Sequence, residues 1–314
     1  MRFKILFFVI LLLPIFLYLV NGVSGKSFVL DASQERLKEE ESDMLKSQVI
    51  QIPGDAPVID STSQEQTELE KTSNVPSVAG VAVKEGYSYQ YVNTEKGKFG
   101  VFLIKMPLSK VRVKTVAANK DDCKGNCPVK PLLQYVKENN AYAAMNGSYF
   151  CPPDYATCKS KINSYDYAFY NSNKTKWMNK KALTWNKTGL ATFSGTSAKF
   201  YKDSSTYKNS SVTAGLSNYP MLLKDGNIVV NLNDLTSVQK NVKGLRGAIG
   251  SDGSNVYLAQ ITRATVLDAA YAMRALGVKH ALNLDGGGSA AMYIDGGYKV
   301  GPGRLLPNAI VLVK

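Results

Sequence analysis

The sequence predicts a folded body that mixes short β-strands, hairpin turns and helices. Residues 111–116 alternate apolar and polar side chains, as a half-buried strand does. Residues 224–227, Lys-Asp-Gly-Asn, separate two apolar runs and predict a hairpin turn. Thr265 begins a capping-box-like segment whose apolar spacing predicts a helix ending at Gly277. Strands joined by turns, together with at least one amphipathic helix, therefore place the body in a mixed class.

Other elements follow from the same periodicities. A second helix is expected over 128–140, because Leu132, Leu133 and Val136 have core spacing. Residues 171–218 are rich in Ser, Thr, Asn and Lys and indicate little beyond isolated short strands. Further strands are expected at 87–91, 98–104, 141–145, 198–201, 246–251, 256–261, 281–284, 290–294 and 309–313.

Charge divides the 314-residue chain unevenly. The net charge is +13, but residues 1–71 carry −4 and the remainder carries about +17. A basic body suggests an anionic partner such as a phosphate polymer, a nucleic acid or a membrane surface. Because the lysines are scattered, with no basic helix and no aromatic-flanked basic motif, we do not expect nucleic acid to be the partner.

The N-terminal segment predicts export. Sixteen apolar residues, 5–20, are interrupted only by Pro14 and follow Arg2 and Lys4. Residues 1–25 are expected to be either a cleaved signal peptide or a retained membrane anchor, and both alternatives stay open. Residues 26–79 are expected to be a flexible, polar and acidic linker, and residues 80–314 the folded domain. The body would then lie outside the cell, secreted or anchored at the outer face of the membrane.

Four cysteines agree with an oxidising compartment. The pairs Cys123 with Cys127 and Cys151 with Cys158 lie close in sequence. We expect two local disulfides. A four-thiolate zinc site would need tighter, repeated spacing.

The chemically richest stretch is Asn283–Ser289, Asn-Leu-Asp-Gly-Gly-Gly-Ser. It places a carboxylate, three glycines and a hydroxyl between two apolar strands. Glycines let backbone amides approach a ligand closely. A second strand, 141–145, ends similarly at Asn146 and Gly147, and a third begins at Arg246. These strand ends are the candidate edges of one site.

The residue inventory limits the chemistry. The single histidine, His280, is expected to face away from Asp285 by strand alternation, which argues against a Ser-His-Asp triad and histidine-rich zinc hydrolysis. Carboxylate, arginine and backbone N–H groups remain, and they suit a phosphate-bearing substrate. Asp285 would act as a base or nucleophile, or hold a divalent cation. No other cofactor is indicated.

Four segments resemble the phosphodiester glycosidase family, in family order. They are AAMNGSYF (143–150), RGAIG (246–250), ATVLDAAYAMRALGVKHALNLDGGGSAAMYIDG (264–296) and GPGRLLPNAIVL (301–312). The resemblance covers roughly residues 80–314. It implies an α+β fold of mixed or antiparallel sheets with packed helices, in a single catalytic domain. It also implies hydrolysis of a sugar-1-phosphodiester at the anomeric carbon.

The resulting hypothesis assigns roles by residue. Arg246 would bind the phosphate, Asp285 would act on water or on the anomeric centre, and Asn146 would orient substrate oxygens. Asp166 or Asp154 is the candidate second carboxylate. The other expected substrate-binding residues are Gly147, Gly286, Gly287, Gly288, Ser289 and Asn308.

Two alternatives to an enzyme stay open. One is a non-catalytic envelope protein that binds anionic glycan in the same cleft. The other is a nucleic-acid or membrane-surface binder driven by the basic body, whose affinity should fall steeply with salt. The sugar, the aglycone and the oligomeric state are not specified by the sequence.

Overall fold

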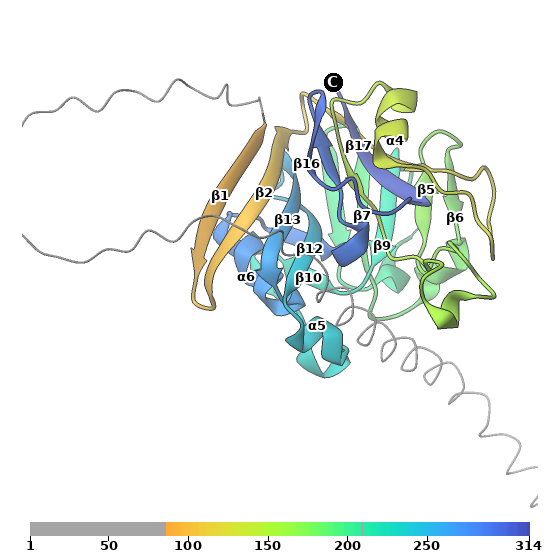
Figure 1. The fold of residues 1–314 in the computed structure, drawn as a ribbon. Helices are drawn as coiled ribbons and strands as arrows, with labels where there is room; N and C mark the ends of the chain where they lie inside the picture. The colour runs from red at the N-terminus through yellow and green to blue at the C-terminus, as the bar shows by residue number, and fades with distance from the viewer. Residues whose placement is uncertain (1–85, 209) are drawn as a thin grey trace, which may run out of the picture.

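The computed structural model describes residues 86–208 and 210–314, and these residues form three antiparallel sheets. The expected segments 1–25 and 26–79 lie outside the described residues. In strand order, the seven-stranded sheet contains β1 (Tyr87–Thr94), β2 (Gly97–Pro107), β13 (Asn255–Ala264), β12 (Gly244–Ser251), β14 (His280–Asn283), β10 (Met221–Lys224) and β11 (Asn227–Ile228). Figure 1 labels β1, β2, β13, β12 and β10 of this sheet, beside strands of the two smaller sheets.

The two smaller sheets have five strands each. One runs β16 (Gly297–Val300), β15 (Met292–Ile294), β4 (Ala143–Asn146), β17 (Asn308–Val313) and β3 (Arg112–Ala117). The other runs β6 (Lys176–Met178), β5 (Phe169–Asn171), β9 (Ala214–Asn218), β7 (Gly189–Ser194) and β8 (Ser197–Tyr201). Inner faces of all three sheets contribute to one apolar cluster, which is the main core.

The expected α+β class with packed helices is wrong, because the described residues are predominantly β-structure. Within residues 86–208 and 210–314, seventeen strands accompany three α-helices of five to ten residues: α4 (Leu132–Asn139), α5 (Ser237–Asn241) and α6 (Val266–Ala275). Residues 171–218, which the sequence left almost unassigned, supply most of the third sheet. Several of its strands have only three to six residues, which is too short for alternation to be recognised.

Strand β2 shows why some segments are almost continuously apolar. Ile104 and Met106 belong to the main core, whereas Val101 and Leu103 belong to a second apolar cluster formed with α6. Successive side chains in a strand point to opposite faces. The seven-stranded sheet is therefore covered on both sides, by the other sheets on one face and by α6 on the other (Figure 1).

Both predicted helices are present with adjusted bounds. Helix α6 begins after Thr265, whose side chain forms a reciprocal capping box with Asp268, and the chain turns at Gly277 with φ +79°. Helix α4 begins only after Pro131, which is extended with ψ 148°, so the predicted start at residue 128 was early. No described helix is long and apolar enough to cross a membrane.

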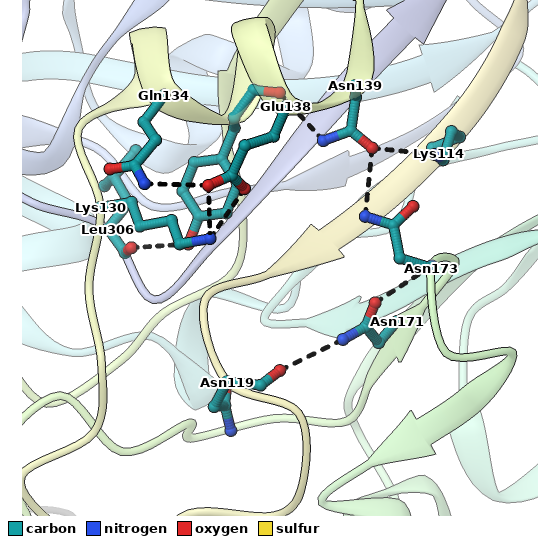
Figure 2. Close-up of polar contacts among 10 residues, drawn as sticks. Lys114, Asn119, Lys130, Gln134, Glu138, Asn139, Asn171, Asn173 and Leu306 are labelled. Carbon is teal, nitrogen blue, oxygen red and sulfur yellow. Dashed lines mark hydrogen bonds and ion pairs between the residues drawn. The ribbon is translucent and has the colours of Figure 1, made fainter.

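Helix α4 fixes the chain segment that precedes β17. Leu306 exchanges two backbone hydrogen bonds of 2.9 Å with Lys130, and its carbonyl also accepts 2.8 Å from the buried Tyr135 hydroxyl. Figure 2 shows Lys130 in addition paired with Glu138, near Leu306. This segment is thereby held against α4 only two residues from Arg304.

The same helix is joined to the smaller sheets at its C-terminal end. Asn139 Oδ1 accepts hydrogen bonds from Lys114 Nζ at 2.8 Å and Asn173 Nδ2 at 3.2 Å (Figure 2). Asn171 in turn donates 3.3 Å to the Asn119 carbonyl. The nearby chain is closed by the Cys123–Cys127 disulfide, and the second disulfide joins Cys151 to Cys158.

Tyr135→Phe removes the hydroxyl that donates to Leu306 without emptying the core. We expect the free energy of unfolding to fall by about 0.5–1.5 kcal/mol, the usual contribution of one buried hydrogen bond. Urea denaturation measures it. Gln134→Ala, on the exposed side of the same helix, should change stability by no more than about 0.5 kcal/mol. Equal effects of the two changes would contradict a buried anchor at Tyr135.

Candidate active site

The site lies where strands from two different sheets end side by side. Strand β4 ends at Asn146, and β14 ends two residues before Asp285. The amide of Asp285 donates 3.2 Å to the Gly147 carbonyl, and Asn146 Nδ2 donates 2.7 Å to the Asp285 carbonyl. Two strand ends that are far apart in sequence are thus joined, as the sequence predicts.

Asn146 is fully buried, and its amide group is engaged by the protein itself. Its Oδ1 accepts from Gln260 Nε2 at 2.8 Å and from the Ala291 amide at 3.1 Å. With the bond to Asp285, this side chain joins β4, β13 and both ends of the glycine-rich loop. In this structure Asn146 therefore positions the loop, whereas the sequence suggested that it orients substrate.

Gly147 permits a very close packing contact with Asn308. A Cβ at Gly147 would lie 1.9 Å from Asn308 Oδ1, so no larger residue fits without movement. Asn308 is 1% exposed, and its amide group pairs with Ser148 through bonds of 2.9 and 3.2 Å. The contacts of Asn308 hold the turn after β4, and with so little exposure it does not line an open pocket.

The other glycines let the loop pass against β12. A Cβ at Gly286 would lie 2.4 Å from the Leu245 carbonyl, and one at Gly247 would lie 2.5 Å from the Asp285 carbonyl. Gly287 has φ +53°, in the left-handed region that glycine adopts easily. The run of glycines is therefore required by packing and backbone geometry at this point.

Asp285 is the titratable centre of the site. Its Oδ1 accepts 2.9 Å from the Gly286 amide, and the Ser289 hydroxyl also bonds to the carboxylate. Burial raises the pKa of Asp285 to about 6, although the Ser289 hydroxyl, the charge of Arg304 and the Gly286 amide each oppose that shift. The carboxylate is thus mostly ionised at pH 7 and is more basic than an ordinary aspartate.

Arg304 is the cation bonded to the glycine loop. Its guanidinium donates 3.4 Å to Ser289 Oγ and 2.5 Å to Asp154, and its amide donates 2.9 Å to the Gly288 carbonyl. A hydroxyl thus links the Arg304 guanidinium to the Asp285 carboxylate. The sequence alone assigns no role to Arg304. The available signal was its position directly after Gly-Pro-Gly, within the last matching segment.

Arg246 does not take the role that the sequence suggested. It is 6% exposed, and its guanidinium donates to the carbonyls of Val242 at 2.7 Å, Ala264 at 3.1 Å and Val238 at 3.2 Å. Within the described residues, no bond joins it to Asp285 or to the glycine loop. Through Nε and one terminal nitrogen, Arg246 anchors α5 and the end of β13 against β12.

The two candidate second carboxylates differ in their surroundings. The negative charge of Asp166 contributes to the raised pKa of Asp285, so Asp166 lies within electrostatic range. Asp154 is paired with Arg304, and half of its side chain is exposed. Asp166 is therefore close enough to influence the Asp285 carboxylate, whereas Asp154 orients the guanidinium.

His280 lies at the opposite end of β14 from Asp285. Its ring stacks on Phe200 at 5.8 Å, and its Nδ1 accepts 3.2 Å from the Asp225 amide. These contacts account for the histidine without catalysis. Among residues 86–208 and 210–314, no group of three or more His, Cys, Asp or Glu side chains could hold a metal ion.

The phosphodiester glycosidase family model matches residues 139–313, which include β4, the glycine loop and Arg304. The chain belongs to the phosphodiester glycosidase family. The match covers more than half of the chain and extends through every strand end described above. No curated protein sequence matches this chain.

Solved structures with the same fold support the family member's architecture. The catalytic domain of zebrafish N-acetylglucosamine-1-phosphodiester alpha-N-acetylglucosaminidase, auto-inhibited by its pro-peptide, has TM-score 0.54 and 16% identity over 73% of this chain and 82% of that one. A hypothetical protein from Synechocystis has TM-score 0.50 and 14% identity over 73% of this chain and 62% of that one. The family member thus spans under two thirds of the Synechocystis protein, and both likenesses establish the fold alone.

Arg246→Ala should destabilise this phosphodiester glycosidase family member strongly. It leaves three buried carbonyls without their charged donor, so we expect the free energy of unfolding to fall by about 3 kcal/mol or more in urea denaturation. Arg274→Ala removes a partly exposed arginine that pairs with Glu95 and should cost about 1 kcal/mol or less. A stable Arg246→Ala protein that fails only in substrate binding would restore the phosphate-binding role.

Asp285→Asn should stabilise the protein in a pH-dependent way. Because the folded-state pKa is raised, the native state holds a proton that the unfolded chain loses, and wild-type stability falls as pH rises from about 4 to 6. The variant's stability gain should therefore grow over this interval to about 1–3 kcal/mol at pH 7.

Urea denaturation at pH 4, 5, 6 and 7 measures this difference. The matched control is Asp122→Asn, an exposed aspartate that also accepts one backbone N–H, from Asn179 at 2.8 Å. A pH-independent effect of Asp285→Asn, equal to that of the control, would show that the Asp285 carboxylate is not destabilised by burial.

Proposed function

We propose that the protein is an exported hydrolase that cleaves a sugar-1-phosphodiester at the anomeric carbon. The observation that carries the proposal is the linked arrangement of Asp285, Ser289 and Arg304. It combines a basic carboxylate, a hydroxyl and a cation on a glycine-rich loop, in a chain of the phosphodiester glycosidase family. A sugar phosphodiester matches these groups, because its anomeric carbon is an electrophile and its phosphate is an anion.

Arg304, instead of Arg246, is proposed to bind the phosphate. A guanidinium presents several N–H donors in a plane and can contact two phosphate oxygens at once. Gly288 lies directly against this group, since a Cβ there would be 3.0 Å from the guanidinium. Without a side chain at Gly288, the phosphate can reach the guanidinium and approach the loop backbone at residues 287 and 288, whereas the Gly286 amide is already bonded to Asp285.

Asp285 is proposed to act as the general base. The carboxylate accepts a proton from water as the water oxygen bonds to the anomeric carbon, and the bond from that carbon to the phosphate oxygen breaks. The phosphate monoester leaves with the bonding electrons, and because it is a good leaving group it needs little help from a general acid. A pKa of about 6 keeps Asp285 ionised near neutral pH while leaving it basic enough to accept the proton.

Asp166 is proposed to stabilise the developing positive charge of the sugar ring. Glycosyl transfer passes through an oxocarbenium-like transition state, which a nearby carboxylate favours. The electrostatic effect of Asp166 on Asp285 supports a position near the reacting atoms. Asn146 and Asn308 then act as positioning residues, through the buried contacts described above.

Export is proposed from two independent features. The structure contains two disulfides and no free cysteine among the described residues, which suits an oxidising compartment. The apolar stretch 5–20 follows two positive charges, as export signals do. An extracellular or envelope glycan that contains phosphodiesters would be accessible to such a protein.

Asp285→Asn should lower kcat for sugar-1-phosphate diesters by about 10²–10⁴-fold, the usual contribution of a general base. Arg304→Ala should lower kcat/KM by about 10²-fold or more, because the departing phosphate loses its cation. Released sugar is measured over a panel of synthetic diesters and purified envelope polymers, with and without EDTA. Arg274→Ala is the matched arginine control and should retain wild-type turnover.

The outcomes separate the candidate functions. Wild-type turnover by folded Asp285→Asn and Arg304→Ala would reject the assignment of these residues. Binding of phosphate-containing glycan by the pure protein without any product would favour the non-catalytic glycan-binding alternative. Activity abolished by EDTA and restored by a divalent ion would indicate that Asp285 holds a cation, instead of acting as the base.

A further inference from the structure

A row of three aromatic side chains leads from the neighbourhood of Asp285 to the surface. The ring centroids of Tyr149 and Tyr167 are 6.2 Å apart, and those of Tyr167 and Trp185 are also 6.2 Å apart. Trp185 is 45% exposed, whereas both tyrosines are partly buried. The outer end of the row, Trp185, is thus its most accessible member.

The inner end of the row is bonded to the segment that carries Asp285. Asn283 Nδ2 donates 2.8 Å to the Tyr149 hydroxyl, and Asn283 precedes Asp285 by two residues. Side chains two residues apart on an extended segment point the same way. The Tyr149 carbonyl also accepts 3.3 Å from the amide of Asp166, which is followed directly by Tyr167. Tyr149 is therefore bonded to the segment that carries Asp285, and Tyr167 is the next residue in the chain after Asp166.

The outer end of the row is rigidly supported. The carbonyl of Trp185 accepts hydrogen bonds from Ser204 Oγ at 2.9 Å and Thr188 Oγ1 at 3.2 Å, and its amide donates 3.2 Å to Ala182. The indole N–H has no hydrogen-bond acceptor among the described residues. A fixed backbone that presents an exposed indole is suited to binding, because little backbone freedom remains to be lost.

We propose that Tyr149, Tyr167 and Trp185 form a subsite for a second pyranose ring of the substrate glycan, beyond the sugar whose anomeric bond is cleaved. Aromatic rings offer an apolar body with a polar tip, which matches the C–H face and the hydroxyls of a pyranose. Arg304 reaches Asp285 through Ser289, whereas Tyr149 reaches the same segment through Asn283. Arg304 then binds the phosphate, and the three aromatic side chains bind the sugar chain.

The proposal rests on the proposed function only in placing the sugar chain beyond the sugar whose anomeric bond is cleaved. Binding at the subsite itself can therefore be tested with unphosphorylated sugars. The probes are hexose and N-acetylhexosamine oligosaccharides of one to five units, first screened on an array with the full-length protein. Titration calorimetry then measures affinity for those that bind. Trp185→Ala should weaken binding of chains of two or more units by about tenfold, while Trp185→Tyr should retain most of the affinity.

The matched control is Tyr91→Ala, which removes a 61% exposed aromatic side chain from the edge strand β1. It should bind all oligosaccharides as the wild type does. Failure of the wild-type protein to bind any of the sugars would overturn the subsite, and so would equal affinities of wild type and Trp185→Ala. Loss of binding in Tyr91→Ala equal to that in Trp185→Ala would also overturn it.

Hydrolysis provides the independent readout. For diesters of a single sugar, Trp185→Ala should keep the wild-type KM, and for diesters of longer chains its KM should rise about tenfold with kcat unchanged. Turnover with no length dependence in either protein would reject the subsite and leave the proposed function intact. Sugar binding that depends on Trp185, without any turnover, would reject the proposed function and leave the subsite intact.

Discussion

The site depends on the carboxamide of Asn146. This buried group bonds to the Asp285 carbonyl, the Ala291 amide and Gln260, so one side chain fixes both ends of the glycine loop to two sheets. A carboxamide suits this task because it donates and accepts simultaneously. An aspartate in its place would lack the donor, and a hydrophobic residue would leave buried backbone groups unpaired. Asn146 thus holds Asp285 by its backbone carbonyl, and it leaves the Asp285 carboxylate available for chemistry.

The two arginines show how environment decides function. Arg246 and Arg304 both belong to segments that resemble the family. Arg246 donates to three carbonyls through Nε and one terminal nitrogen, and these bonds make it part of the scaffold. Arg304 is bonded to a hydroxyl, a carboxylate and an exposed glycine loop, and its charge moderates the pKa of Asp285. Its chain segment is held by Leu306 against α4, so a network far from the loop helps to orient the cation.

Much of the site could be predicted from the sequence, because chemistry and glycine content coincide at Asn283–Ser289. The strand end at Asn146 was also located correctly, whereas the strand expected to begin at Arg246 begins two residues earlier, at Gly244. The direction of the Arg246 side chain was not predictable, since the carbonyls that bind it come from α5 and β13. Arg304 lies in a Gly-Pro-Gly turn without periodicity, and its proximity to Ser289 depends on tertiary folding. The fold class was missed because the third sheet consists of short strands separated by polar turns.

The smaller sheet that contains β4 has a consequence for how this family can vary. Asn146 is paired with Ala309, and Met145 with Met292, on the two neighbouring strands. Because side chains alternate along a strand, an insertion or deletion of one residue in β4 would turn Asn146 to the opposite face and release the glycine loop. Length changes are far less damaging in surface loops, such as the one closed by Cys123 and Cys127. Insertions and deletions should therefore be rarer within β4 than elsewhere in the chain, even where its apolar residues are exchanged for others.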